Sequence, residues 1–462
     1  MAEGKLGRVS ASQTQRWMKL GAETAPERVG QKAREKKDEP FTNLLSQLRV
    51  PLLRRAYELL NAQAASGIDG VSWKAYGENL EANLQDLENR VHRGGYKPPP
   101  VRRVHIPKAG GKTRPLGLPT VEDKVLQQAV RMLMEPIYEE SEFLGFSYGY
   151  RPGRSAHDAL NALYVAIAER KVSWVLDGDI QSFFDTIDHG WLRSLLEERI
   201  RDGRLLRLIV RWLRAGVLEE GVWHATAEGT PQGGIISPLL ANIYLHYVLD
   251  VWAHDWRRTV ARGEVYLVRY ADDFVLGFQY EDDARRFHEQ LSERLGKHGL
   301  TLHPDKTRVI RFGRFAAKDA PKDGHRRPET FDFLGFTHYC GRSRSGKFKL
   351  KRRTSKKKRK EKWRAVREAL RRRTHHPPRE VHAWLCRVLR GYFQYYGVPD
   401  NTRTLEAFRR QVVWYWLKRL GRRSHKATWP KDRQQAFLAR FALPRPRVVH
   451  PYPSSRLLFP ST

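Results

Sequence analysis

Cysteine is almost absent from this chain, which has only Cys340 and Cys386 among its 462 residues. A disulfide framework or a cysteine-based zinc site needs more cysteines than these two. The sequence therefore excludes both as the basis of the fold.

Long hydrophobic runs are also missing. No apolar stretch reaches the roughly 18 residues that a membrane-spanning helix needs. Residues 1–40 are polar and lack the apolar core of a signal peptide. The sequence thus predicts a cytoplasmic protein without a membrane partner.

Acidic residues are few relative to basic ones. The chain has 51 Asp and Glu against 85 Lys and Arg, which gives a net charge of +34 and a pI near 10.3. Between residues 342 and 373, 18 basic residues face only two acidic ones. Such an excess of positive charge indicates a polyanionic partner, and nucleic acid is the first expectation.

The length and the hydrophobic spacing predict two or three domains of mixed α and β structure. Apolar residues at helical spacing predict a helix within residues 41–61, and the turn signal Gly110-Gly111 predicts a β-hairpin over 101–119. We expect further helices at 121–138, 355–373, 378–396 and 402–421, and alternating strands and helices over 170–338.

Two adjacent carboxylates, Asp272 and Asp273, lie between two apolar runs typical of β-strands, 265–268 and 274–278. The pattern predicts a strand, a tight turn and a second strand, with the acids at the tip. Neighbouring charges cannot be buried there without a counter-charge, and a divalent cation such as Mg²⁺ suits hard oxygen ligands. The simpler alternative is a solvated turn.

A second group of carboxylates ends another apolar strand, at residues 174–180. Asp177 and Asp179 share one face of that strand because side chains alternate with a period of two. Carboxylates on neighbouring strands could together hold a pair of Mg²⁺ ions, as phosphoryl transfer from a triphosphate to a 3′-hydroxyl requires. The alternative, an acid that caps the following helix, suits Asp185 or Asp188.

The ordered set of motifs along the chain resembles that of the bacterial group II intron reverse transcriptases, which are also maturases. The resemblance covers about residues 50–445. The motifs that carry it lie at residues 102–108, 111–117, 148–155, 179–185, 229–242, 270–273, 300–307 and 331–336.

This resemblance implies an α+β fold of the right-hand polymerase type. Fingers and palm would occupy residues 51–338, and an all-α three-helix thumb, or maturase X domain, would occupy 339–445. A basic N-terminal extension at 1–50 and a C-terminal tail at 446–462 would flank them.

The resemblance also assigns a catalytic site. Asp179, Asp272 and Asp273 would be the catalytic acids and would bind two Mg²⁺ ions, with help from the carbonyl of Ile180. The resemblance thus assigns the metal role to Asp179 rather than to Asp177, a choice that the residues alone leave open. Lys306 matches the lysine that would protonate the departing pyrophosphate, and its alternative is an ordinary surface lysine.

Five further residues are expected at the incoming nucleotide. Lys108, Lys112 and Arg114 lie on the hairpin of the fingers, where cations can clamp a triphosphate. Phe184 would exclude a ribose 2′-hydroxyl, and Gln232, in a glycine-rich loop before a helix, would contact the nucleotide or the template. The alternatives are that the three hairpin cations are ordinary exposed charges, that Phe184 is a core aromatic residue, and that the loop of Gln232 is a simple capped turn.

In the thumb, a run of basic residues is expected to bind RNA through its phosphates and shape. The implied partners are intron RNA, an RNA template with a DNA primer, a DNA target and deoxynucleoside triphosphates. The basic residues of the run are Lys356, Lys357, Lys358, Arg359 and Lys360.

The resemblance therefore predicts an RNA-directed DNA polymerase that copies RNA into cDNA and assists splicing and retrohoming of a group II intron. It would act in the bacterial cytosol, associated with the nucleoid. Because the chain lacks the paired cysteines of the HNH nuclease found in many members, we expect an endonuclease-lacking type. Two alternatives stay open: a host-adapted reverse transcriptase in defence or repair without an intron partner, and an RNA-binding splicing factor only.

Overall fold

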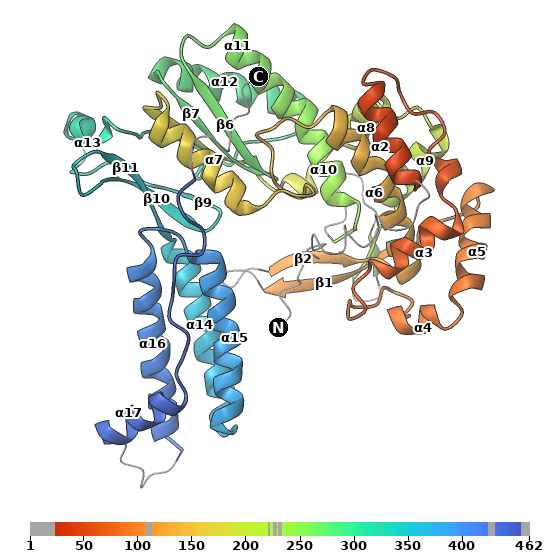
Figure 1. The fold of residues 1–462 in the computed structure, drawn as a ribbon. Coiled ribbons are helices and arrows are strands. Elements are labelled where there is room, and N and C mark those ends of the chain that lie inside the picture. Colours follow the sequence, from red (N-terminus) through yellow and green to blue (C-terminus); the bar gives the residue numbers. More distant parts are fainter. Residues whose placement is uncertain are drawn as a thin grey trace. The chain divides into compact units, whose positions relative to one another are not determined.

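The computed structural model describes residues 24–107, 113–219, 222–224, 229, 233–324, 326–423 and 430–453. The chain divides into two compact units, and each unit is built from three separate stretches. The first contains Met1–Gly153, Ile180–Trp256 and Gln290–His303, and the second contains Arg154–Asp179, Arg257–Glu289 and Pro304–Thr462. Figure 1 labels most of the helices and several strands of both units.

The first unit is mainly helical, and α6 forms its centre, with α2 and α3 packed against it. α6 confirms the helix expected at 121–138. The α-helices of the first unit are α2 (Ala25–Glu35), α3 (Val50–Glu58), α4 (Trp73–Gly77), α5 (Leu80–His92), α6 (Val121–Ser141), α8 (His189–Glu197), α9 (Gly203–Leu213) and α10 (Ser237–Leu245). Its short 3-10 or π-helical segments are η1 (Leu45–Gln47), η3 (Phe183–Asp185) and η4 (His246–Asp250). Two more helices, α11 (Val251–Thr259) and α12 (Glu281–Lys297), each run from one unit into the other.

The helix expected within residues 41–61 is interrupted. Only a short 3-10 turn, η1, forms before α3 begins at Val50, and Arg49 between them is extended. Pro51 lies in the first turn of α3. Proline lacks the amide that an interior helical residue donates, so it starts a helix rather than continuing one.

A four-stranded sheet of order β2-β1-β4-β5 belongs to the first unit. β1 (Val101–Pro107) and β2 (Thr113–Leu118) pair in antiparallel fashion, which confirms the hairpin expected at 101–119. β4 (Val217–Glu219) lies parallel to β1 and pairs with β5 (Val222–His224).

The second unit contains a four-stranded antiparallel sheet of order β6-β7-β3-β8, and α7 (Ala156–Glu169) packs on it. Its central strands are β3 (Trp174–Asp179) and β7 (Asp273–Phe278), flanked by β6 (Val265–Tyr270) and β8 (Arg308–Arg311). Gly178 separates the two acids of β3, and a Cβ there would lie 2.3 Å from the ring of Phe274. A glycine at this point therefore leaves room for the Phe274 ring on the strand face opposite the two acids.

A three-stranded sheet and a helical bundle complete the second unit. The sheet, in the order β11-β10-β9, contains β9 (Phe331–Phe333), β10 (Phe336–Arg342) and β11 (Phe348–Thr354), and it follows the short helices α13 (Ala316–Asp319) and η5 (Ala320–Asp323). The bundle contains α14 (Lys356–Arg372), α15 (Pro378–Tyr396) and α16 (Thr402–Gly421), followed by α17 (Lys431–Arg440). These bounds confirm the three helices expected from residue 355 onward.

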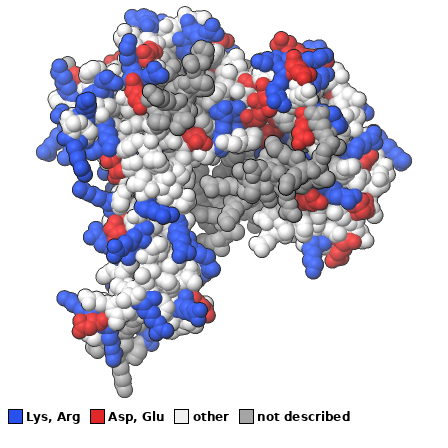
Figure 2. Space-filling model, in the orientation of Figure 1, with Lys and Arg blue, Asp and Glu red and all other residues white. Residues whose placement is uncertain are grey.

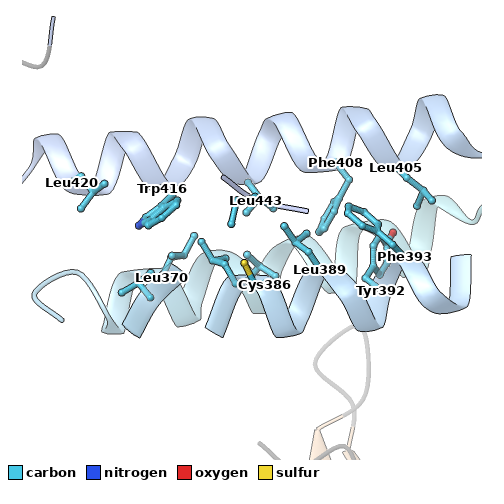
Figure 3. Packing of buried hydrophobic residues seen from close by; sticks show 14 residues of the cluster. Leu370, Cys386, Leu389, Tyr392, Phe393, Leu405, Phe408, Trp416, Leu420 and Leu443 are labelled. Carbon is cyan, nitrogen blue, oxygen red and sulfur yellow. The ribbon is translucent and has the colours of Figure 1, made fainter. Parts of the chain in front are cut away.

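Apolar side chains from all three bundle helices meet in one core, which Figure 3 shows from close by. Leu389 of α15 lies beside Phe408 of α16, and Trp416 of α16 lies farther along the same core; all three are almost fully buried. Leu443, from the segment after α17, packs into the same core. The fold is thus of mixed α and β structure. Within the described ranges, no helix is both long and apolar enough to cross a membrane.

Candidate active site

The Asp272-Asp273 pair lies at the hairpin between β6 and β7, as the sequence predicts. Tyr270 pairs with Asp273, so Ala271 and Asp272 form a two-residue turn. Ala271 has a φ of +57°, a left-handed conformation that costs a residue other than glycine about 1 kcal/mol. The Nη1 of Arg269, a fully buried residue, donates a hydrogen bond of 3.1 Å to the Ala271 carbonyl. A buried arginine therefore supports this strained turn.

Strand pairing brings the two acidic motifs together. Asp179, the last residue of β3, lies directly opposite Asp273, the first residue of β7. Like charges at such facing positions repel each other, because neighbouring strands hold them close. The sheet thus gathers at one end carboxylates that are far apart in the sequence.

The surroundings of Asp273 disfavour its negative charge. Burial raises the pKa of the Asp273 carboxyl well above its ordinary value, and the charges of Asp177, Asp272 and Asp179 raise it further. A hydrogen bond from the backbone N–H of Leu334 acts in the opposite direction. The neighbouring acids therefore disfavour the negative charge of Asp273, and a cation bound beside them would relieve that repulsion.

Asp177, the fourth carboxylate, has an arginine beside it. Burial, partly offset by the guanidinium of Arg308, raises the pKa of Asp177 to about 7. Arg308 faces Asp177 across the β3–β8 pair, with 3.9 Å between its Nε and the carboxylate Oδ2. Asp177 thus has a counter-charge from the protein itself.

Lys306 supplies a positive charge to Asp179. Its Nζ forms a close ion pair with the carboxylate Oδ2 of Asp179. The side chain of Lys306 is 57% exposed, and that of Asp179 is 27% exposed, so solvent reaches both groups. The lysine predicted to take part in catalysis is therefore in direct contact with a predicted metal ligand.

The carboxylates of Asp179, Asp272 and Asp273 are of the type that binds a divalent cation, although their side chains do not point to one common position in this structure. Among the described residues, no three His, Cys, Asp or Glu side chains are arranged closely enough to hold a metal ion. The acids nevertheless crowd at the ends of adjacent strands, and their mutual repulsion raises the pKa of Asp273. Hard carboxylate oxygens suit Mg²⁺. Binding would require the Asp179 carboxylate to turn from Lys306 toward a shared ion.

Two other predicted residues lie in the first unit. Ile180 is 2% exposed and forms an isolated antiparallel bridge with Leu302. Phe184, in η3, is 9% exposed, and its ring lies edge-on to that of Phe183, with 5.5 Å between the centroids. Gly229 lies against the same segment, since a Cβ there would be 2.8 Å from the carbonyl oxygen of Phe184.

The remaining nucleotide-binding predictions are only partly described. Lys108, Lys112 and Gln232 lie outside the described residues. The backbone of Arg114 is described on β2, opposite Ile106, but its side chain is not.

A buried polar network, which the sequence did not predict, supports the loop that precedes α10. The Oε1 of Gln127 accepts the Ile235 N–H at 2.9 Å, and its Nε2 donates to Asp123 at 3.2 Å. Asp123 also accepts hydrogen bonds from Tyr96 Oη and Trp212 Nε1, at 2.9 and 2.6 Å. Two polar side chains one turn apart on the apolar face of α6 were the signal that could have revealed it.

The basic run predicted to bind RNA begins α14. All five side chains from 356 to 360 are exposed, and Ser355 caps the helix by accepting the Lys358 N–H at 3.3 Å. Figure 2 shows Lys and Arg side chains spread over the visible face of the bundle, with few acidic ones between them. Cations at a helix N-terminus oppose the helix dipole, so this placement costs stability unless an anion is bound.

The stretch that carries these residues is similar to known proteins. Residues 106–338 match the family described as "Reverse transcriptase (RNA-dependent DNA polymerase)". Protein YkfC of Escherichia coli (strain K12) is 36% identical over 316 residues, which cover 62% of this chain and 78% of that protein. Group II intron-encoded protein LtrA of Lactococcus lactis subsp. cremoris is 40% identical over 222 residues, which cover 48% of this chain and 37% of LtrA. Nuclear intron maturase 4, mitochondrial, of Arabidopsis thaliana is 31% identical over 231 residues, 48% of this chain and 27% of that protein.

Proposed function

Because the chain belongs to the reverse transcriptases of the bacterial group II intron type, which are RNA-directed DNA polymerases, we propose that Asp179, Asp272 and Asp273 form its catalytic site. The observation that carries this proposal is the strand pairing of Asp179 with Asp273, next to the turn that holds Asp272. In this proposal β3, β6, β7 and β8 belong to a polymerase palm, the β1–β2 hairpin to the fingers and the α14–α16 bundle to a thumb.

The proposed cofactor is a pair of Mg²⁺ ions held by the three aspartates and the Ile180 carbonyl. Bound there, they would polarise the attacking 3′-hydroxyl and balance charge on the leaving pyrophosphate. The aspartates orient the reacting groups, and the exposed ammonium of Lys306 donates a proton to the pyrophosphate as it leaves. Since Lys306 pairs with Asp179 in this structure, it must exchange that partner for the pyrophosphate during the reaction.

The residues proposed to select the incoming nucleotide are assigned from the resemblance of their motifs to those of the group II intron reverse transcriptases. Lys108, Lys112 and Arg114 bind the triphosphate of a deoxynucleotide, with Arg114 able to bind phosphate oxygens in a bidentate manner. Phe184 excludes a 2′-hydroxyl, and Gln232 contacts the nucleotide or the template.

For RNA binding, the proposal assigns the exposed basic start of α14 to intron RNA and to the duplex of RNA template and DNA primer. Its five cations, including Lys356 and Arg359, are exposed at a helix N-terminus, where phosphate oxygens are favoured on electrostatic grounds. The chain would assist splicing by stabilising the folded intron, and it would then copy the intron at a DNA target.

Primer extension on poly(rA)/oligo(dT) tests the catalytic assignment. We expect Asp272→Ala to abolish cDNA synthesis while RNA binding stays close to the wild-type level. Asp282→Ala is the matched control, because Asp282 is an exposed aspartate of the same unit, on α12. cDNA synthesis by Asp272→Ala at the wild-type rate would refute the proposal.

A further inference from the structure

A hydrogen bond from the helical bundle holds a turn that lies beside a proposed catalytic carboxylate, entirely within the second unit. The Oη of Tyr395, on α15, donates to the carbonyl of Leu334 at 2.9 Å. The backbone N–H of the same Leu334 lies near the carboxylate of Asp273 and favours its charged form, and β9, which leads into the turn, packs against β7. The turn between β9 and β10 is therefore bonded to a bundle helix on one side and lies beside the carboxylate at the start of β7 on the other.

The turn that makes this connection has an unusual conformation. Leu334 and Gly335 are the two residues between β9 and β10, and their φ angles are +49° and +79°. Two consecutive left-handed residues normally require Asn or Gly, so leucine is a poor local choice. Its contacts must hold it there, because strained backbone persists only where the surrounding structure fixes it.

The bundle packs closely against this turn from α15. A Cβ at Gly335 would lie 2.8 Å from the Oη of Tyr396, so only glycine fits without displacing that side chain. The ring of Tyr395 stacks on Phe336 and also contacts His157, with centroid distances of 5.7 and 5.1 Å. These contacts leave the Tyr395 side chain little freedom to move away from the turn.

The Tyr395 hydroxyl is also a dependable donor. Burial, with smaller contributions from the nearby charges of Tyr270 and Asp273, raises the pKa of Tyr395 to about 12. The hydroxyl therefore keeps its proton at neutral pH, and the hydrogen bond to Leu334 is always available.

We propose that Tyr395 is a positioning residue for the metal site: its hydroxyl fixes the turn at Leu334, and that turn orients the Asp273 carboxylate. The inference rests on the proposed catalytic role of Asp273. The bundle would then affect the metal site indirectly, through the turn. Residues that orient a metal ligand commonly change metal affinity by about 10- to 100-fold.

The test measures metal binding without catalysis, by the rise in melting temperature of the full chain during a titration with Mg²⁺ in the absence of nucleic acid. We expect Tyr395→Phe to raise the Mg²⁺ concentration at the midpoint about three- to tenfold, less than a directly bonded partner would. The Mg²⁺ dependence of primer extension should shift by the same factor, with the KM for deoxynucleotide unchanged. Tyr392→Phe is the matched control, since Tyr392 is a buried tyrosine of the same helix that packs on Phe408 in the bundle core.

A second pair of variants tests the turn from its other side. Gly335→Ala places a Cβ against Tyr396 at a positive φ and should shift the midpoint in the same direction. Gly346→Ala introduces a similar strain, at a φ of +78° with open space around the Cβ, and should leave the midpoint unchanged. If Tyr395→Phe does not fold, this pair still decides the question.

Asp273→Ala separates failure of this inference from failure of the proposed function. If Asp273→Ala loses the Mg²⁺ response while Tyr395→Phe and Gly335→Ala keep the wild-type midpoint, the positioning role is wrong and the catalytic site stands. If Asp273→Ala itself keeps the wild-type response and activity, the proposed function is wrong and this inference fails with it.

Discussion

At the residue scale, Lys306 forms an ion pair with Asp179, so a divalent cation at the proposed site would have to compete with it for that carboxylate. We therefore expect Lys306→Ala to have two effects of opposite sense. The Mg²⁺ concentration for half-maximal activity should fall, because the ammonium no longer competes, and turnover should fall about 10²-fold or more, as for loss of a general acid. Primer extension over a range of Mg²⁺ concentrations measures both.

The control for this variant is Lys318→Ala, which removes an exposed lysine from α13 of the same unit. Unchanged turnover in Lys306→Ala would contradict its role as a proton donor. Unchanged Mg²⁺ dependence would contradict the competition at Asp179.

His338, in β10, makes stability depend on pH. It is fully buried and stacks on Phe331, and burial together with the charge of Arg352 lowers the pKa of His338 to about 3. Because the folded-state pKa lies below the unfolded value of about 6.5, the unfolded chain takes up the proton first, and stability is lost as pH falls. This group should remove about 2 kcal/mol of stability between pH 7 and pH 5.

Denaturant unfolding at the two pH values checks this prediction. His338→Phe replaces the imidazole with a ring that does not titrate. The free energy of unfolding of this variant should therefore fall by about 2 kcal/mol less than that of the wild type between pH 7 and pH 5. His375→Phe removes an exposed histidine and should keep the wild-type pH dependence. Equal pH dependence in His338→Phe and the wild type would show that the lowered pKa is wrong.

Single residues differ in how far the sequence predicts them. Asp272 and Asp273 stand out because charged residues interrupt apolar strands, and strand pairing then brought Asp179 opposite Asp273 as expected. Tyr395 and His338 give no such signal. Their burial and partners come from chain segments far away in the sequence, which local patterning does not encode.

At the element scale, the start of α14 carries cations where a helix prefers anions. We expect replacement of Lys356, Lys357 and Lys360 by Gln to weaken RNA binding and to make it less sensitive to salt, because fewer counterions are released. Thermal stability should stay equal or rise slightly, since the helix dipole is less opposed. RNA affinity measured across a salt series, together with a melting curve, checks both expectations.

The matched control moves the same change to the other end of the helix. Arg371 and Arg372 lie in the last turn of α14, where cations favour the dipole, so their replacement by Gln should lower stability slightly. If the two variants lose RNA affinity equally, the start of α14 is not the preferred RNA contact.

Elements with strong periodicity are the ones that the sequence predicts well. α14, α15 and α16 follow the expected ranges because each has an apolar stripe that packs into one core. The segment before α3 does not follow the predicted helix, because the apolar spacing continues through Pro51 although that proline starts a new helix. The left-handed turn at Leu334 is equally hidden, since leucine does not favour it and only tertiary contacts stabilise it.

At the scale of the whole molecule, the sequence order does not reveal which segments form a unit. Each unit collects three separate stretches, and the chain passes from the second to the first between Asp179 and Ile180, inside one sequence motif. Such a division depends on long-range packing. The predicted domain boundaries, at residues 50, 338 and 445, stay predictions. Net charge, by contrast, is a property of the sequence alone, and it pointed to nucleic acid before any fold was considered.

The central claim is that Asp179, Asp272 and Asp273 share bound metal, and cleavage by Fe²⁺ substituted for Mg²⁺ tests it most directly. With ascorbate and peroxide, bound Fe²⁺ generates radicals that cut the backbone near the ion, and mass spectrometry locates the cuts. We expect cuts close to both 179 and 272 in the wild type, suppressed by excess Mg²⁺ and lost in Asp272→Ala. Cuts at only one of these segments, or cuts that persist in Asp272→Ala, would contradict it.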